Sequence, residues 1–116
     1  MSTLKSVTNL AQIEKRLGVS LLKVAKFCQK WQITELALFG SVLREDFNPS
    51  SDIDFLVTFS PEAKIGLAEV DEMEKELKNM VKRKIDLVVK KSIEASHNWI
   101  RRRNILDTAE VIYGER

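Results

Sequence analysis

Residues 52–57 read Asp-Ile-Asp-Phe-Leu-Val, and this segment constrains the fold more than any other part of the chain. Successive side chains of a β-strand point to opposite faces, so a strand here places Asp52 and Asp54 on one face and the intervening apolar residues on the other. The two Cα atoms then lie roughly 7 Å apart. Because neighbouring carboxylates repel each other, the pattern predicts a buried strand that begins at a cation site.

A third acid stands in a similar position. Asp86 lies near the start of the apolar run 84–89, which we expect to form another strand. If that strand lies beside the first, three carboxylates converge, and such a set suits Mg²⁺, which prefers oxygen ligands. Two ions ~3.5–4 Å apart can clamp the attacking and leaving oxygens of a phosphoryl displacement. We predict that Asp52 and Asp54 bridge two magnesium ions, while Asp86 holds the one that activates an acceptor hydroxyl and helps remove its proton.

The other half of the expected site follows the apolar strand predicted at 33–39. Gly40 ends that strand, and a glycine lets the backbone approach a phosphate closely. If a helix begins there, the amide and hydroxyl of Ser41 donate hydrogen bonds to the phosphate. Arg44 would lie one turn along that helix, within reach of a triphosphate. We therefore predict that Gly40, Ser41 and Arg44 bind nucleotide phosphates.

The rest of the chain predicts one α+β domain over residues 1–116, because no repeat or linker divides it. Thr8 or Asn9 is expected to cap a first helix that ends at Gly18, and Ser20 to cap a second. The chain divides into three predicted parts: N-terminal helices (1–32), a catalytic core (33–91) and a C-terminal helical tail (92–116). The core is expected to contain strands at 33–39, 52–59 and 84–89 and a helix at 67–81. The helical tail is expected to be broken near Asn104. A small mixed sheet of three or four strands, flanked by helices on at least one face, is the simplest packing.

Composition excludes several other classes. The 116 residues contain one cysteine, Cys28, which rules out an internal disulfide and a cysteine-rich zinc site. No run approaches the ~20 apolar residues that a membrane span needs, and the first residues lack the apolar core of a signal peptide. We therefore expect a cytoplasmic protein with no membrane partner. The formal net charge of +2 is too small to indicate a nucleic-acid-binding surface.

The combined motif resembles the signature of the polymerase-β nucleotidyltransferase superfamily: Gly40-Ser41, ten residues, then Asp52-Ile53-Asp54, flanked by Leu38-Phe39 and Phe55-Leu56-Val57. Within that superfamily, the short chain most resembles the minimal nucleotidyltransferases (MNT), which are the antitoxins of HEPN/MNT toxin–antitoxin modules. The resemblance spans residues 33–113 and includes the tail at 103–109.

The resemblance implies a magnesium-dependent transferase with ATP as substrate. It further implies transfer of AMP to a hydroxyl, which in the antitoxin group is a tyrosine of the cognate HEPN ribonuclease, and a hetero-oligomer with that toxin. The length supports a protein acceptor, since 116 residues leave no room for a template-holding domain. An alternative is an antitoxin that neutralises its toxin stoichiometrically, by binding alone.

A DNA-binding alternative rests on residues 9–31. Gly18 between two apolar-patterned helices resembles the turn of a helix-turn-helix, and the second helix would present Lys23, Lys26 and Lys30 to operator DNA. Glu14, however, stands where such motifs need a small residue. Two helices packed on the sheet are the favoured interpretation, although an autoregulating antitoxin can combine both roles.

Overall fold

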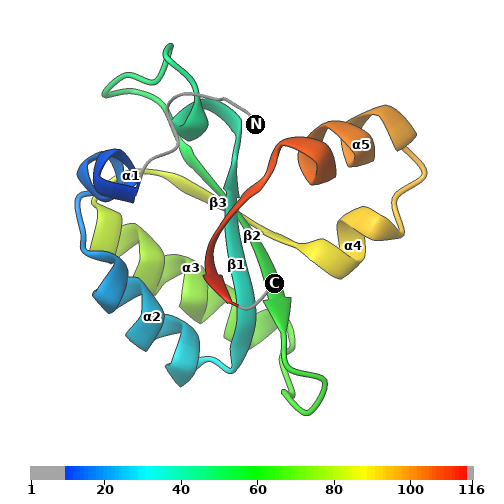
Figure 1. The fold of residues 1–116 in the computed structure, drawn as a ribbon. Helices are drawn as coiled ribbons and strands as arrows, with labels where there is room; N and C mark the ends of the chain where they lie inside the picture. The colour runs from blue at the N-terminus through cyan, green and yellow to red at the C-terminus, as the bar shows by residue number, and fades with distance from the viewer. Residues whose placement is uncertain (1–9, 115–116) are drawn as a thin grey trace.

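The computed structural model describes residues 10–114, so the predicted caps Thr8 and Asn9 lie outside it. Within that range, none of the helices is long and apolar enough to cross a membrane. In chain order (Figure 1), the elements are α1 (Leu10–Leu17), α2 (Leu21–Lys30), β1 (Ile33–Phe39), the 3-10 turn η1 (Gly40–Leu43), β2 (Ile53–Phe59), α3 (Leu67–Val81), β3 (Ile85–Val89), α4 (Lys90–Glu94), α5 (Trp99–Thr108) and β4 (Glu110–Gly114).

The four strands form one mixed sheet in the order β3-β2-β1-β4. β1 runs antiparallel to both β2 and β4, whereas β2 and β3 are parallel. A parallel pair needs a crossover connection, and α3 supplies it. This arrangement confirms the predicted α+β fold with a small mixed sheet, and it places the two acid-bearing strands side by side.

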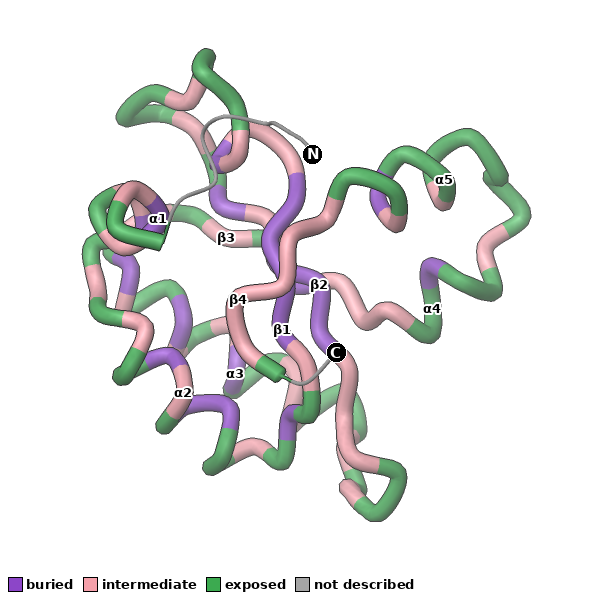
Figure 2. The backbone as a smooth tube through the Cα atoms, viewed as in Figure 1, coloured by how far each residue is buried: buried purple, intermediate pink, exposed green. Residues whose placement is uncertain are grey.

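Helices cover both faces of the sheet (Figure 1): α1, α2 and α3 lie on one side, and α4 and α5 on the other. The alternation predicted for β2 is confirmed, because Ile53, Phe55 and Val57 are fully buried in the core beneath the first three helices. On the opposite face, Leu56 packs with Ile105 of α5 in a second, smaller cluster. The central strands are therefore buried on both sides (Figure 2), and half-buried Asp54 interrupts that pattern near the start of β2.

The two N-terminal helices are joined by the predicted turn. Gly18 adopts a left-handed conformation (φ +75°), and the Ser20 side chain accepts a hydrogen bond from the Lys23 amide. Glu14 has a capping role that the sequence did not suggest, because its carboxylate accepts a 2.8 Å hydrogen bond from the Leu21 amide at the start of α2. Burial raises the pKa of the Cys28 thiol to about 12, which fits an unreactive core residue.

The C-terminal region differs from its prediction. The tail at 92–116 was expected to be helical with a break near Asn104, but α5 runs through that position and residues 110–114 form the strand β4. β4 pairs with β1, with Val111 opposite Ala37. Glu-Val-Ile-Tyr has β-branched and aromatic residues that suit a strand, and pairing with the free edge of β1 decides the conformation of so short a segment.

Candidate active site

The backbone brings two of the three predicted acids into direct register. Asp54 of β2 lies opposite Asp86 of the parallel neighbour β3, and opposite Phe39 of β1 on its other side. Leu56 and Val88, two residues further along the two strands, belong to the cluster beneath α4 and α5. Side chains two apart share a face, so both acids point to that side of the sheet. Asp52 comes immediately before β2, which begins one residue later than predicted.

The charges of the neighbouring acids act on Asp54. Burial raises the pKa of the half-buried Asp54 carboxyl above its ordinary value, and the neighbouring carboxylates of Asp86 and Asp52 raise it further. The cationic side chains of Arg44 and Arg101 lower the same pKa in opposition. Asp54 is thus the centre of a local concentration of negative charge, in which a bound cation relieves repulsion.

The donor set fits magnesium, although it is not a closed cage. Among residues 10–114, no three acidic, histidine or cysteine side chains already stand together as a metal-binding group. Mg²⁺ commonly binds through one or two carboxylates, water and substrate phosphates, so it does not require such a group. Asp54 and Asp86 offer carboxylate oxygens from adjacent strands, and Asp52 offers another two residues before Asp54. These three residues would hold the metal.

Gly40 forms a cradle for the Asp54 carboxylate. Its φ of +79° lies in the left-handed region, and a Cβ placed there would stand only 2.3 Å from Asp54 Oδ2. The backbone conformation and the lack of space both require glycine at this position. The signature glycine and the signature acid, fourteen positions apart in the sequence, are therefore in contact through the β1–β2 pairing.

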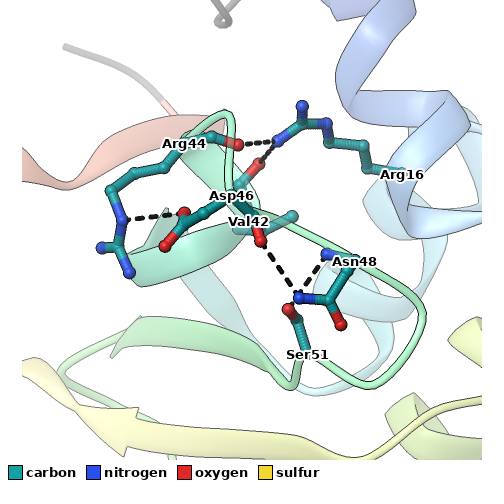
Figure 3. Close-up of polar contacts among 6 residues, drawn as sticks. All are labelled: Arg16, Val42, Arg44, Asp46, Asn48 and Ser51. Atoms are coloured by element: carbon teal, nitrogen blue, oxygen red, sulfur yellow. Dashed lines mark hydrogen bonds and ion pairs between the residues drawn. The ribbon is translucent and has the colours of Figure 1, made fainter.

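The structure changes the predicted surroundings of Ser41 and Arg44. Residues 40–43 form a single 3-10 turn in place of the expected helix, and Arg44 follows it with extended backbone. A helix dipole therefore contributes nothing at Ser41, which leaves its amide and hydroxyl as the local donors. Arg44 Nε pairs with Asp46 Oδ1 at 3.2 Å (Figure 3), and both side chains are more than half exposed. Such a surface pair contributes little, so a phosphate can displace it.

Arg101 was not among the predicted site residues. The structure separates it from the two arginines that follow: Arg102 donates to the Ser96 carbonyl, and Arg103 pairs with Asp107. Arg101 instead acts electrostatically on Asp54. It lies four residues before the buried Ile105, so both share the face of α5 that turns toward the sheet. The four-residue spacing between Arg101 and the apolar Ile105 was the signal in the sequence that could have placed Arg101 on this face.

Comparison with known proteins decides the family. The profile of the nucleotidyltransferase domain matches residues 23–112. The chain belongs to this family. Over 93 residues, the nucleotidyltransferase is also 31% identical to "Putative protein adenylyltransferase MJ1217" of Methanocaldococcus jannaschii, with 80% of this chain and 84% of the relative covered.

Solved structures share the fold of this nucleotidyltransferase. The structure described as a "putative minimal nucleotidyltransferase" matches with a TM-score of 0.63 and 22% identity, covering 90% of this chain and 97% of the other. A toxin–antitoxin structure with AMP-PNP matches with a TM-score of 0.65 and 17% identity, covering 84% of this chain and 76% of the other. The structure of a tri-AMPylated Shewanella oneidensis HEPN toxin in complex with an MNT antitoxin matches with a TM-score of 0.56 and 18% identity, covering 82% of this chain and 70% of the other. The fold expected from the motif is thereby confirmed.

Proposed function

We propose that this nucleotidyltransferase is an antitoxin that transfers AMP from ATP to a hydroxyl, in particular a tyrosine, of a cognate HEPN ribonuclease and so neutralises it. The observation that supports this most strongly is the juxtaposition of Gly40, Asp54 and Asp86 across three adjacent strands or strand ends. The M. jannaschii relative is named a protein adenylyltransferase, which supports a protein as the acceptor. The structurally similar complex contains an AMPylated HEPN toxin, which supports a HEPN toxin as that acceptor.

The proposed reaction forms a bond between the acceptor oxygen and the α-phosphorus of ATP, and breaks the bond from that phosphorus to the bridging oxygen, so that pyrophosphate leaves. Gly40 and Ser41 bind the phosphates through backbone amides and a hydroxyl, and Arg44 neutralises their charge. Asp52, Asp54 and Asp86 hold the metal. When bound, Mg²⁺ supplies charge neutralisation at the reacting phosphate and acidifies the acceptor hydroxyl. Asp86 accepts the proton of that hydroxyl and returns it to water.

An exposed apolar pair on the helix that carries Arg101 is suited to an acceptor protein. Trp99 and Ile100, in the first turn of α5, are 58% and 56% exposed. The next residue, Arg101, is one of the two arginines whose charge lowers the pKa of Asp54. A large aromatic side chain left in water is typical of an interface anchor. Because arginines follow the pair directly, an acceptor surface with acidic groups around an apolar centre would complement it.

The test combines the purified protein, ATP, magnesium and the protein encoded beside its gene, as the candidate HEPN toxin. We expect adenylylated toxin by mass spectrometry and loss of its ribonuclease activity. Asp52→Asn/Asp54→Asn should abolish both effects, while Asp71→Asn, a matched change on the exposed face of α3, should abolish neither. If the double variant still neutralises the toxin without transferring AMP, the stoichiometric alternative is correct and catalysis is not the mechanism.

A further inference from the structure

The loop between η1 and β2 connects both halves of the signature, and two arginines from outside the signature hold it. This loop, residues 44–52, is mostly exposed, with Phe47 half-buried at its centre. Arg16 of α1 and Arg83, which precedes β3, each place their guanidinium over the Phe47 ring, at 5.1 and 4.5 Å from its centroid. Such cation–π contacts fix an aromatic side chain in a defined position.

Arg83 holds the part of the loop that leads into Asp52. Its Nη1 donates hydrogen bonds to the carbonyl oxygens of Asn48 at 3.1 Å and Ser51 at 2.8 Å. The Ser51 carbonyl belongs to the peptide bond that joins Ser51 to Asp52. On the other side of Asp52, the Ile53 amide donates to the carbonyl of Lys84 at 3.1 Å. Two consecutive residues before β3 thus hold the backbone on both sides of Asp52.

Arg16 holds the beginning of the same loop. Its Nη1 donates to the carbonyl oxygens of Val42, at 2.9 Å, and Arg44 (Figure 3). The 3-10 turn is therefore anchored to α1 where the loop starts, while Arg83 anchors the loop where it ends. Between the anchors, the Ser51 amide donates to the Asn48 carbonyl at 2.9 Å, which closes a local turn. Arg83, directly before the strand that bears Asp86, attaches this turn to that strand.

We infer that Arg83 is a positioning residue, which fixes the Asp52 carboxylate relative to Asp86 and thereby sets the affinity of the metal site. The inference rests on the proposed function, since it takes these acids as metal ligands. Asp52 precedes the paired part of β2, and the bonds from Arg83 to the Ser51 carbonyl and from the Ile53 amide to Lys84 hold the peptide bonds on its two sides. Residues that orient metal ligands typically change metal affinity 10–100-fold when removed.

The test measures binding of Mn²⁺ by electron paramagnetic resonance, in the presence of a non-hydrolysable ATP analogue. Arg83→Met should raise the Mn²⁺ dissociation constant about 10-fold. Arg83→Lys, which keeps the charge and one donor nitrogen but loses the planar fork, should give an intermediate value. Arg103→Met serves as the matched control, because Arg103 is an exposed residue paired only with Asp107 among the described residues, and it should leave Mn²⁺ affinity unchanged. Circular dichroism checks that each variant is folded.

A double-mutant cycle with Asp52→Asn separates positioning from a general structural role. If Arg83 acts through Asp52, Arg83→Met has no further effect on Mn²⁺ affinity in the Asp52→Asn background. An equal loss in both backgrounds would overturn the positioning role, as would a normal affinity in Arg83→Met itself. If Asp52→Asn alone leaves Mn²⁺ affinity unchanged, the metal site of the proposed function fails, and the role of Arg83 fails with it.

Discussion

Replacing Gly40 with alanine tests the contact between the two halves of the signature. The new Cβ would lie 2.3 Å from Asp54 Oδ2, whereas real Cβ contacts are rarely closer than 3.0–3.4 Å. The carboxylate must therefore move by roughly 1 Å, and a displacement of that size in a catalytic group costs on the order of 100-fold in rate. We expect Gly40→Ala to reduce AMP transfer by about that factor.

Gly18→Ala is the matched control, because it separates backbone strain from displacement of Asp54. Gly18 has nearly the same φ (+75° against +79°), but nothing lies within 4 Å of its added Cβ. Alanine in this conformation costs ~1–2 kcal/mol, so both variants should melt roughly 5–15 °C below the parent. Only Gly40→Ala should lose activity when both are assayed at a temperature where circular dichroism shows them folded.

Two results would refute this reasoning. If Gly40→Ala keeps near-parental transfer activity, the Asp54 carboxylate does not need the position that the glycine allows. If Gly18→Ala loses as much activity as Gly40→Ala, backbone strain is responsible and the contact with Asp54 is irrelevant. Initial rates at saturating ATP and acceptor concentrations, measured on the folded proteins, distinguish these cases.

The other predictions concern charge and partner binding. Because the pKa of Asp54 is raised in the folded state, the metal-free protein loses stability as pH rises from about 3.9 through that pKa. In EDTA, Asp54→Asn should therefore melt at a higher temperature than the parent at neutral pH, and at the same temperature below about pH 3.9. A lower melting temperature of Asp54→Asn at neutral pH would contradict this. Trp99→Ala/Ile100→Ala should weaken binding of the HEPN acceptor at least 10-fold by calorimetry, without changing affinity for the ATP analogue. Leu22→Ala, at an equally exposed apolar position on α2, should leave acceptor binding unchanged; equal losses in both would argue against docking on α5.

Much of the fold was predictable because its core elements have local signals. The alternation in β2 and the apolar positions one turn apart in α3, Met73 and Leu77, identified a strand and a helix without knowledge of their partners. The register that places Asp54 opposite Asp86 followed from the assumption that the two strands are neighbours, and the structure confirms that pairing. The catalytic and metal-binding roles of these acids stay predictions.

The features that were missed depend on contacts between distant segments. β4 is a strand because β1 offers an unpaired edge, and that edge is not visible in residues 110–114. The turn that begins at Gly40 stays a single 3-10 turn. The guanidinium of Arg16 in α1 donates a hydrogen bond to the carbonyl of Val42 in this turn, and the two residues are 26 positions apart in the sequence. The DNA-binding alternative also remains untested, although Lys30, one of its three lysines, forms an ion pair with Glu76 of α3.

The most direct test of the central claim follows the phosphorus atoms of ATP. The protein is incubated with magnesium, with ATP radiolabelled at either the α- or the γ-phosphorus, and with the protein encoded beside its gene as the candidate HEPN acceptor. AMP transfer predicts label on the HEPN protein from the α-phosphorus alone, with none when Asp52→Asn/Asp54→Asn replaces the parent. Label from the γ-phosphorus, equal α-label with the double variant, or no label with the parent would contradict the account.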